Sequence, residues 1–586
     1  MYIVVAEKAS VARAIKKALR GQPVVVESVS GHVMGLDFDK KYNDWRRTNP
    51  LELFSVTPRW VVKDWKSYRR LMNLFNKFYA KRPILVIATD NDHEGELIGY
   101  EVLNIARRVF GRNVPYKRMR FNSTKESELR KAWNSLENDL KWEWVNKALF
   151  RHMFDLVTGS AFTRLLTLSA RKAGARVRLL SWGSCQTPTL WYVVEREKEV
   201  RSFRPKTYYV LELYLDIRGE VHKFTTKPIE SLEKAEELRK KLKSLGCGTV
   251  KDCTFTAAVE PRPLPLDTDT LVRDVVRIAR VSGRSVMSAA EELYAEGYIS
   301  YPRTETNIWR GVDHREVLQE LAKSYLKPYI FTLKVNPRNG RKDDQAHPPI
   351  HPTGVYPGGS KLKGLIWDYV ARRYLANVIY GDAKLAKWRV VVDFGLLTVE
   401  KSGKYVTDEG FYKVFPFFKP REERMPLLFR GEKLKLVKVR KVKKKTKPPP
   451  RLAEHELLKL MESNGIGTDA TRHEYPSIIL QRGYAKKERS RFRPTELGMK
   501  LVEVLESVDS SLVTPETRRR VEELMKKVER REASVEEALK EALSIYKRLF
   551  QELSEKEQTV AEELARAIKK DLEPSSSPSQ QQSNQS

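Results

Sequence analysis

The chain has few cysteines and no long apolar run, and each shortage excludes a class of protein. Only three of its 586 residues are cysteine, Cys185, Cys247 and Cys253, and their spacings fit no zinc ribbon. A reducing, intracellular environment is therefore expected. No apolar run approaches the ~18 residues of a membrane span. The strand-like start, residues 2–6, leads us to expect no signal peptide and no membrane association.

Acidic residues are scarce relative to basic ones. Lys and Arg number 109 against 76 Asp and Glu, which gives a net charge of +33. Such a charge favours polyanionic partners, chiefly nucleic acid, although ribosomal and membrane-surface proteins share it. Charged residues make up 32% of the chain, which fits the ion-pair-rich surface of a thermophile. The apolar fraction of 41% is enough for several cores, and the length predicts about four domains.

Strand and helix patterns alternate over residues 1–145, which predicts an α/β domain with a largely parallel sheet. Strands are expected at 2–6 and 82–89, and helices at 10–19 and 97–110. Residues 146–200 read as helical. Residues 207–258 read as strands with one helix at 232–245 and one short hairpin at 216–221.

The second half of the chain holds three further patterns. Residues 267–300 predict a helix, a turn and a helix, as in a helix-turn-helix or winged-helix unit. Residues 433–451 contain ten Lys or Arg and predict a basic β-ribbon, which either contacts phosphates or is an edge strand protected by lysines. Residues 515–570 predict amphipathic helices, and the tail from 574 to 586 is expected to be disordered.

Three carboxylates directly follow the strand at 82–89. The segment Thr89-Asp-Asn-Asp-His-Glu-Gly-Glu96 places Asp90, Asp92 and Glu94 at the carboxyl end of that strand, where α/β sheets bind ligands. Their mutual repulsion is relieved by a hard divalent cation, and the oxygen ligands suit magnesium. The alternative is a solvated acidic turn.

The first strand ends with similar chemistry, in Glu7 and Lys8. In a parallel sheet Glu7 can lie beside Asp90, and Lys8 next to a helix N-terminus makes an anion site. One sheet edge then offers carboxylates for a metal and a cation for a phosphate. That combination suggests phosphoryl transfer on a nucleic-acid backbone.

A tyrosine and an arginine stand two residues apart in Gly297-Tyr-Ile-Ser-Tyr-Pro-Arg-Thr-Glu305. On an extended segment Tyr301 and Arg303 share a face. We expect the arginine to favour the phenolate and to hold a phosphate for attack, which would leave a covalent phosphotyrosine. For a lone tyrosine, a packed aromatic is the ordinary interpretation.

These segments together resemble the type IA DNA topoisomerases, and most of all the archaeal topoisomerase III-like enzymes. Ser181-Trp-Gly-Ser-Cys-Gln-Thr-Pro-Thr-Leu190 is similar to the family's S-x-G-R-V-Q-T-P-T-L segment. Ala346-His-Pro-Pro-Ile-His-Pro-Thr353 is similar to A-H-x-A-I-x-P-T, and Gly465-Ile-Gly-Thr-Asp-Ala-Thr-Arg472 to G-I-G-T-x-A-T-R. The motifs follow in the family's order, and the resemblance covers most of the chain.

The resemblance implies a multidomain α/β and α+β protein, a four-domain torus around a hole for duplex DNA. It implies a toprim metal-binding domain, a winged-helix-like tyrosine domain that acts as a gate, and a β-rich hinged arch. The expected ranges are 1–145 for the toprim domain, 146–206 plus 451–565 for the single-strand-binding domain, 207–258 plus 390–450 for the arch, 259–389 for the tyrosine domain and 566–586 for the tail.

The implied activity is that of an ATP-independent isomerase. It cuts one DNA strand through a 5′-phosphotyrosine, passes a strand and religates, and so relaxes negative supercoils, decatenates DNA, or both. The cofactor would be Mg²⁺, the partner a single-stranded segment of DNA, and the location the cytoplasm at the nucleoid. We expect a monomer, and the resemblance allows a helicase or a single-strand-binding protein as partner. No GxxxxGK[ST] loop is present for ATP.

The family's residue roles carry over position by position. Tyr301 would be the nucleophile, and Arg303 and Lys8 would contact the scissile phosphate. Glu7 would be a magnesium ligand and could double as general acid for the leaving 3′ oxygen. The other expected magnesium ligands are Asp90, Asp92 and Glu94. The side chains expected to line the single-strand path are His32, Arg151, Asp155, Gln186, His347 and Arg472.

The sequence departs from the family pattern at a few positions. Ser184 and Cys185 stand where the family usually has Arg and Val, so a phosphate contact is either missing there or supplied by another side chain. Ala9 and His93 replace a frequent Pro and Arg. Two rival functions stay open: a metal-dependent toprim nuclease or primase-like enzyme, which would not need Tyr301, and a basic nucleic-acid-binding protein without catalysis.

Overall fold

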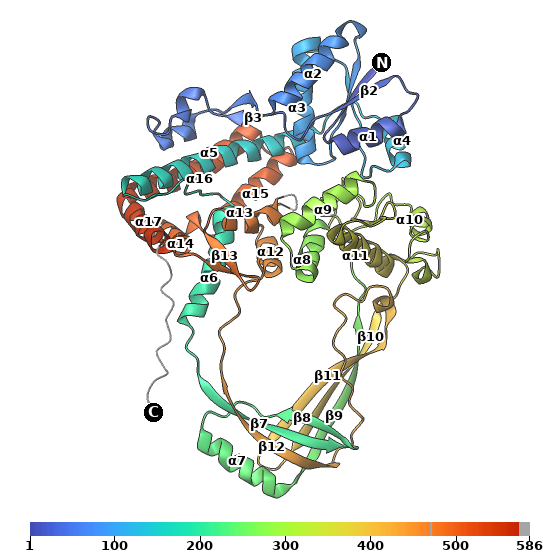
Figure 1. Cartoon of the computed structure of the whole chain (residues 1–586), viewed down its shortest axis with the longest axis vertical. Helices are drawn as coiled ribbons and strands as arrows, with labels where there is room; N and C mark the ends of the chain where they lie inside the picture. The colour runs from blue at the N-terminus through green and yellow to red at the C-terminus, as the bar shows by residue number, and fades with distance from the viewer. Residues whose placement is uncertain (469–470, 573–586) are drawn as a thin grey trace.

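The computed structural model describes residues 1–468 and 471–572. Residues 573–586 of the tail predicted to be disordered lie outside these residues, whereas the first part of the predicted tail, 566–572, belongs to a helix that ends at Leu572. Figure 1 shows the elements arranged as a ring, with helical and α/β parts on one side and a β-rich arch on the other. Within the described residues, no helix is both long and apolar enough to cross a membrane.

The N-terminal domain is built on a four-stranded parallel sheet, as the sequence predicted. Its strand order is β2-β1-β5-β6. Helices alternate with these strands along the chain and lie on both sides of the sheet. Ala6 pairs with Ala88, so the residues after β1 and β5 emerge at one sheet edge. The bounds are β1 Tyr2–Ala6, α1 Ala9–Ala18, β2 Val24–Ser28, β3 Met34–Asp37, β4 Arg59–Val62, α2 Trp65–Lys77, β5 Ile84–Ala88, α3 His93–Phe110, β6 Tyr116–Arg118 and α4 Glu126–Asn134.

Helix α3 begins four residues earlier than predicted. The Asp92 carboxylate accepts the Gly95 N–H at 2.7 Å and caps the helix, so the acidic segment forms its first turn. The apolar spacing that marked the helix in the sequence starts only at Leu97. The polar first turn therefore looked like a loop.

A helical body packs beside the sheet. Its two parts are far apart in sequence but share one core, in which Phe154, Trp182, Leu505 and Tyr546 are buried. The predicted helices between 515 and 570 are present. The bounds are α5 Trp142–Lys172, α6 Gln186–Ser202, α12 Glu454–Ser463, α13 Tyr475–Gln481, β13 Ala485–Glu488, β14 Arg491–Pro494, α14 Glu496–Val508, α15 Pro515–Glu529, α16 Val535–Glu555 and α17 Glu557–Leu572.

The arch is a closed barrel of six strands in the order β10-β11-β8-β7-β12-β9. The basic ribbon, β12, lies between β7 and β9, so the edge-strand alternative is wrong. The predicted hairpin is confirmed, since Asp216 pairs with Val221. The predicted boundaries at 258 and 390 fall inside β9 and β10. The bounds are β7 Thr207–Ile217, β8 Glu220–Thr225, α7 Leu232–Leu245, β9 Cys247–Glu260, β10 Ala383–Asp393, β11 Thr398–Asp408 and β12 Lys433–Lys445.

The segment between β9 and β10 contains the predicted helix-turn-helix pair. Asp267 caps the first helix and Ser282 the second, each by accepting a backbone N–H three residues on. Tyr301 lies in the loop that follows. The helices are α8 Thr268–Ala279, α9 Gly283–Ala295, α10 His314–Leu321 and α11 Lys361–Val378. Short 3₁₀ turns occur in the chain at 40–43, 50–55, 79–81, 327–329, 410–413, 472–474 and 510–512.

Candidate active site

The ends of β1 and β5 bring Glu7, Lys8 and Asp90 together, as predicted from the parallel sheet. The Glu7 carboxylate accepts the Asp90 N–H at 3.1 Å, and Lys8 Nζ lies 2.9 Å from Asp90 Oδ2. The other oxygen, Asp90 Oδ1, is buried and has no hydrogen-bond partner among the described residues. An unsatisfied buried carboxylate oxygen is costly unless a cation binds it.

Burial and the neighbouring carboxylates raise the pKa of Glu7 to about 8. Burial alone would lower the pKa of Lys8, but Asp90 and Glu7 outweigh that effect and raise it. Without a cation this edge therefore keeps one proton on Glu7. The unpaired Asp90 oxygen and the protonated Glu7 both indicate a centre that a hard divalent cation fits.

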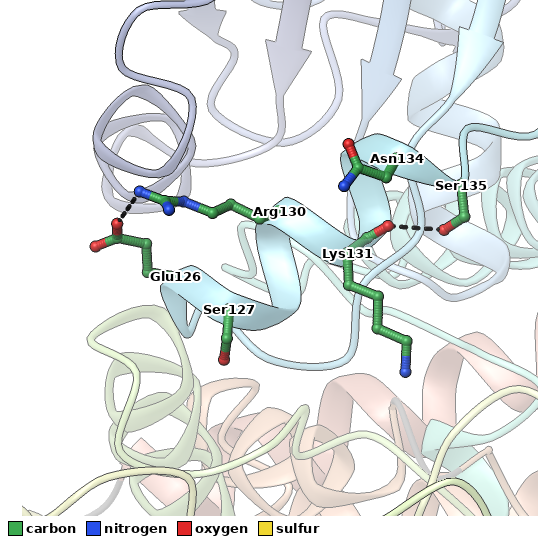
Figure 2. A pocket seen from close by; sticks show the side chains of 6 residues that line it. All are labelled: Glu126, Ser127, Arg130, Lys131, Asn134 and Ser135. Carbon is green, nitrogen blue, oxygen red and sulfur yellow. Dashed lines mark hydrogen bonds and ion pairs between the residues drawn. The ribbon is translucent and has the colours of Figure 1, made fainter.

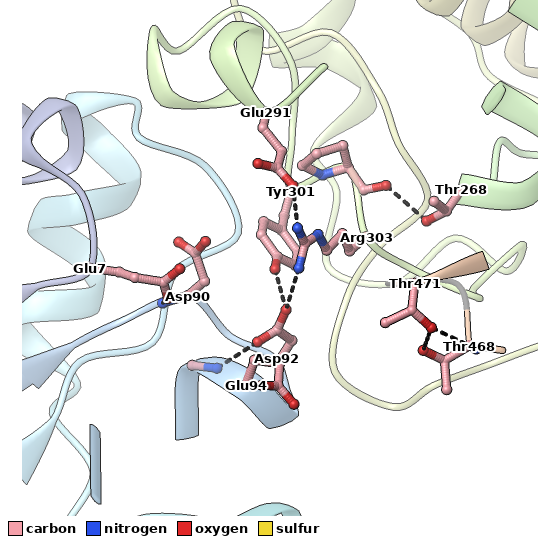
Figure 3. A network of polar contacts seen from close by, with 12 residues as sticks. Glu7, Asp90, Asp92, Glu94, Thr268, Glu291, Tyr301, Arg303, Thr468 and Thr471 are labelled. Atoms are coloured by element: carbon pink, nitrogen blue, oxygen red, sulfur yellow. Dashed lines mark hydrogen bonds and ion pairs between the residues drawn. The ribbon is translucent and has the colours of Figure 1, made fainter. Parts of the chain in front are cut away.

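Tyr301 reaches this edge from the other domain. Its hydroxyl donates to Asp92 Oδ2 at 2.5 Å, and Arg303 Nη1 lies 3.9 Å from the same oxygen (Figure 3). The arginine also pairs with Glu291 on α9. Tyr301 is only 2% exposed, and its ring lies against those of His347 and Tyr294. The structure therefore joins a tyrosine and an acidic strand end that lie 209 residues apart in the chain.

Arg303 does favour the phenolate, as predicted, but in this closed arrangement its effect on the pKa of Tyr301 is outweighed. Burial raises the pKa of Tyr301 well above 10, Asp92 and Asp90 raise it further, and Arg303 only partly opposes them. The hydroxyl is thus protonated and donates to Asp92. The pKa of Asp92 is lowered: burial opposes this, but Arg303 and the tyrosine hydroxyl outweigh it.

Glu94 does not lie together with the other predicted magnesium ligands. Its side chain points away from Glu7 and Asp90 in Figure 3. Its carboxylate instead pairs with Arg151 Nη2 at 2.7 Å, His152 Nε2 at 2.8 Å and His32 Nε2 at 3.0 Å. Helix α3 explains the separation, because Asp92 caps the helix whereas Glu94 lies within its first turn and faces α5.

A groove of about 770 Å³ runs past this site. It gathers six of the predicted site residues: Asp92, Glu94, Arg151, Arg303, His347 and Arg472. His347 Nδ1 donates to the Asp344 carboxylate at 3.0 Å, and the buried Nε2 of His347 has no partner among the described residues. Arg472 binds the Gly467 carbonyl at 2.7 Å and pairs with Asp269.

His32, Asp155 and Gln186 do not line that groove. Gln186 begins α6 and binds the backbone and hydroxyl of Ser181, so it holds the turn before the helix. Asp155 lies 3.3 Å from both Ser184 Oγ and Arg518 Nη1. His32 lies beside Glu94 and Glu101.

Arg518 is a residue that the sequence did not reveal. Its buried guanidinium donates to Ser184 Oγ at 2.8 Å and pairs with Glu522 at 2.6 Å. It thus stands next to the position where the family usually has an arginine. Glu291 and His152 were missed as well. No local motif marks these three, because the site residues that they contact, Ser184, Arg303 and Glu94, each lie more than ten residues away in the chain.

A second hollow, of about 750 Å³, lies on the surface at α4 (Figure 2). Its lining comes from one helix and the residue after it, where Arg130 pairs with Glu126 and the Ser135 hydroxyl binds the Lys131 carbonyl. None of the residues singled out in the sequence lies there. The groove beside Tyr301 is therefore the candidate site.

Comparison with known proteins agrees with this geometry. A family model described as "DNA topoisomerase" matches residues 139–540, and one described as "Toprim domain" matches residues 2–124. The chain belongs to the type IA DNA topoisomerases. It is 33% identical to DNA topoisomerase 1 of Archaeoglobus fulgidus over 530 residues, which cover 88% of this chain and 77% of that protein. The predicted toprim domain and the predicted topoisomerase family are both confirmed.

An animal protein and a bacterial structure are also similar to this chain. DNA topoisomerase 3-beta-1 of Homo sapiens is 32% identical over 560 residues, 90% of this chain and 64% of that protein. The structure of full-length topoisomerase I from Thermotoga maritima matches with a TM-score of 0.75 over 94% of this chain and 90% of that one, at 24% identity. At that identity the likeness supports the fold, and it confirms the predicted torus.

Proposed function

We propose that this topoisomerase cuts one DNA strand with Tyr301 and rejoins it, and so relaxes negative supercoils, decatenates DNA, or both. The observation that carries the proposal is the contact of the Tyr301 hydroxyl with Asp92 at 2.5 Å, at the edge that holds Glu7, Lys8 and Asp90. A nucleophile, two phosphate-binding cations and a set of carboxylates meet there. A toprim nuclease would need only the carboxylates.

The proposed reaction is a transesterification. The Tyr301 oxygen attacks the phosphorus, the bond from phosphorus to the 3′ oxygen breaks, and the 5′ phosphate stays on the tyrosine. The hydroxyl proton passes to Asp92, which already accepts it in a hydrogen bond. Glu7, whose pKa is raised to about 8, supplies a proton to the leaving 3′ oxygen in the state in which Asp90 and Asp92 alone hold the ion and Glu7 is protonated. Arg303 and Lys8 stabilise the charge on the phosphate.

Toprim domains bind Mg²⁺, and the residues at the strand edge fit that ion. We propose Asp90 and Asp92 as its main ligands, with Glu7 as a third ligand when it is ionised. The unpartnered Asp90 Oδ1 supports this assignment. The ion would supply positive charge that offsets the phosphate and the carboxylates. The sequence-predicted Glu94 is left out of this set because its carboxylate is bonded elsewhere.

The bond energy is kept in the phosphotyrosine, so no nucleotide is needed to reseal the strand. We propose that His347, Arg151 and Arg472 guide the single strand along the groove. Several expectations stay predictions: a cytoplasmic location at the nucleoid, a monomeric state, a helicase or single-strand-binding partner, and the four domain ranges.

Negatively supercoiled plasmid tests the proposal. The protein should relax it with Mg²⁺ and without ATP, and chelation of the metal should stop relaxation. Linked circles with a single-stranded gap, assayed in parallel, separate decatenation from relaxation. Linear or nicked products that accumulate without relaxed circles would support the toprim nuclease instead. Binding with no change in topology would support the non-catalytic alternative.

A further inference from the structure

Two histidines and a glutamate converge beside the active site without a role in the proposed reaction. Glu94 Oε2 lies 3.0 Å from His32 Nε2 and 2.8 Å from His152 Nε2. The three ligand atoms all lie within 4.8 Å of one another. Over residues 1–468 and 471–572, this is the one group of three or more His, Cys, Asp or Glu side chains with such convergent ligand atoms.

The surroundings hold each of these side chains in orientation. His32 Nδ1 lies 2.7 Å from the buried Glu101 carboxylate, whose other oxygen accepts the N–H groups of Val33 and Met34. That carboxylate fixes His32 with Nε2 directed at Glu94. Arg151 binds Glu94 Oε1 at 2.7 Å and so turns Oε2 toward the histidines. Metal-ligating histidines characteristically have such a carboxylate behind them.

We propose that His32, His152 and Glu94 form a second metal site, which takes a zinc-class ion. Imidazole nitrogen suits Zn²⁺, Co²⁺ or Ni²⁺, whereas the all-oxygen edge at Asp90 and Asp92 suits Mg²⁺. At metal–ligand bonds of 2.0–2.1 Å, neighbouring ligand atoms of a tetrahedral ion are about 3.3 Å apart. The two separations from Glu94, 2.8 and 3.0 Å, need to widen by only a few tenths of an ångström, and the two histidine nitrogens lie within 4.8 Å of each other.

The fourth position is open to solvent. The His32 and His152 side chains are 31% and 28% exposed, and Glu94 lines the groove. Water can therefore complete the coordination. An N₂O site with one open position is common for zinc ions.

The ion would tie together three segments of the chain. His32 precedes β3, Glu94 lies in the first turn of α3, and His152 lies on α5. The first two belong to the toprim domain, and α5 belongs to the helical body. Bound metal thus cross-links these two parts next to the groove and fixes Arg151 there through Glu94.

Cobalt binding to the full-length, metal-stripped protein tests the site directly. Four-coordinate Co²⁺ with nitrogen ligands absorbs visible light far more strongly than six-coordinate Co²⁺ with oxygen ligands, so the two sites are distinguishable. One equivalent of strongly absorbing Co²⁺ is expected, and Zn²⁺ should displace it. Asp90→Asn, which alters only the magnesium edge, should keep the band.

His152→Gln and His32→Gln should each lose the band and weaken Zn²⁺ binding at least ~10-fold, since each removes one ligand. His93→Gln is the matched control. His93 precedes Glu94 but pairs with Glu529, and its substitution should change nothing in the cobalt spectrum. Glu101→Gln keeps all three ligands and should weaken binding by about 10–100-fold with the band retained.

Thermal unfolding gives an independent readout. Zn²⁺ should raise the Tm of the parent and of His93→Gln but not that of His152→Gln. Because His152 is partly exposed on α5, His152→Gln should fold, and circular dichroism checks this. If that variant does not fold, His32→Gln carries the same test. A parent without a strong cobalt band, or equal Zn²⁺ affinity in His152→Gln and His93→Gln, would show that the cluster is only an ion-pair network and overturn the proposal.

Discussion

The two halves of the active site are held in place differently. Glu7 and Asp90 follow paired strands whose buried residues form the core of one domain, and a backbone N–H links them directly. Tyr301 stands in a loop of another domain. Hydrogen bonds between the two domains hold this loop against the carboxylates. The Tyr301 N–H donates to the Asn122 carbonyl at 2.8 Å, and the Thr124 hydroxyl donates to the Tyr294 carbonyl at 2.9 Å.

The difference teaches which half can move. Glu7 and Asp90 could separate only if strands β1 and β5 came apart. Tyr301 could move away from these carboxylates if a few hydrogen bonds and a patch of shared core were broken. A cut strand held by Tyr301 on one side and by the strand edge on the other would open when these domains part. Substitutions in the two halves should therefore have separable effects.

The largest effect is expected on the fixed half. Asp90→Asn together with Asp92→Asn removes the negative charge that would bind Mg²⁺, and loss of several kcal/mol of charge stabilisation lowers relaxation by about 10³-fold or more. Relaxation rates over a Mg²⁺ titration measure this, with circular dichroism as the folding control. Undiminished relaxation by the double variant would refute the carboxylate assignment.

A smaller loss of activity is expected from substitution of Arg303, which lies with Tyr301 on the other half of the active site. Arg303→Ala keeps the nucleophile but removes a donor to the phosphate, which costs ~10²–10³ in cleavage rate. Arg303→Lys should recover part of the rate, because the charge remains while the planar donor geometry is lost. Single-turnover cleavage of labelled single-stranded DNA gives the rates. Equal rates for parent and Arg303→Ala would leave that arginine without a role at the phosphate.

Glu7 should make the Mg²⁺ affinity of the strand edge depend on pH. Its pKa of about 8 lies above the ordinary 4.5, so below pH 8 the metal-free protein holds a proton there that Mg²⁺ must displace. Mg²⁺ affinity should therefore rise about tenfold per pH unit from pH 6 to 8 and level off above. Calorimetric titration measures this. Glu7→Gln should bind Mg²⁺ with little pH dependence over that range, and a flat profile in the parent would place Glu7 outside the ligand set.

The smallest effect is expected from an exposed ion pair at the boundary between the toprim domain and the tyrosine domain. Lys125 Nζ pairs with Glu316 at 2.6 Å across the domain boundary, and both side chains are exposed to solvent. Such pairs contribute about 0–1 kcal/mol, so Lys125→Ala should raise the open fraction by about fivefold at most. Hydrogen exchange of the Tyr301 amide, which is bonded across the boundary, reports this opening. Lys131→Ala is the matched control, because Lys131 lies on nearby α4 and forms no ion pair with the residues that the structure describes.

The sequence predicted best what short segments determine. The strand at 2–6, the helix at 232–245 and the shared edge of Glu7 and Asp90 follow from local periodicity and parallel pairing. Contacts between distant segments were not predictable in this way. The Tyr301–Asp92 bond, the turn of Glu94 toward His32 and His152, and the placement of Arg518 beside Ser184 depend on how segments far apart in the chain pack together, which no local pattern records.

The raised pKa of Tyr301 shows a further limit of sequence reasoning. A neighbouring arginine was visible in the motif, but the burial and the two aspartates that outweigh it were not. The predicted domain boundaries at 258 and 390 fall inside strands for a related reason. Long strands of the arch, β9 and β10, run on toward the tyrosine domain without a break in pattern.

Covalent capture on DNA tests the central claim most directly. The protein is denatured during reaction with end-labelled single-stranded DNA and then run on a gel, with Tyr301→Phe beside it. The parent should carry label only when the label lies 3′ of the cut, because Tyr301 holds the 5′ phosphate. Tyr301→Phe should bind the DNA as well as the parent does and carry no label. A labelled Tyr301→Phe protein, or free cut ends from the parent without any adduct, would contradict the mechanism and favour a toprim nuclease.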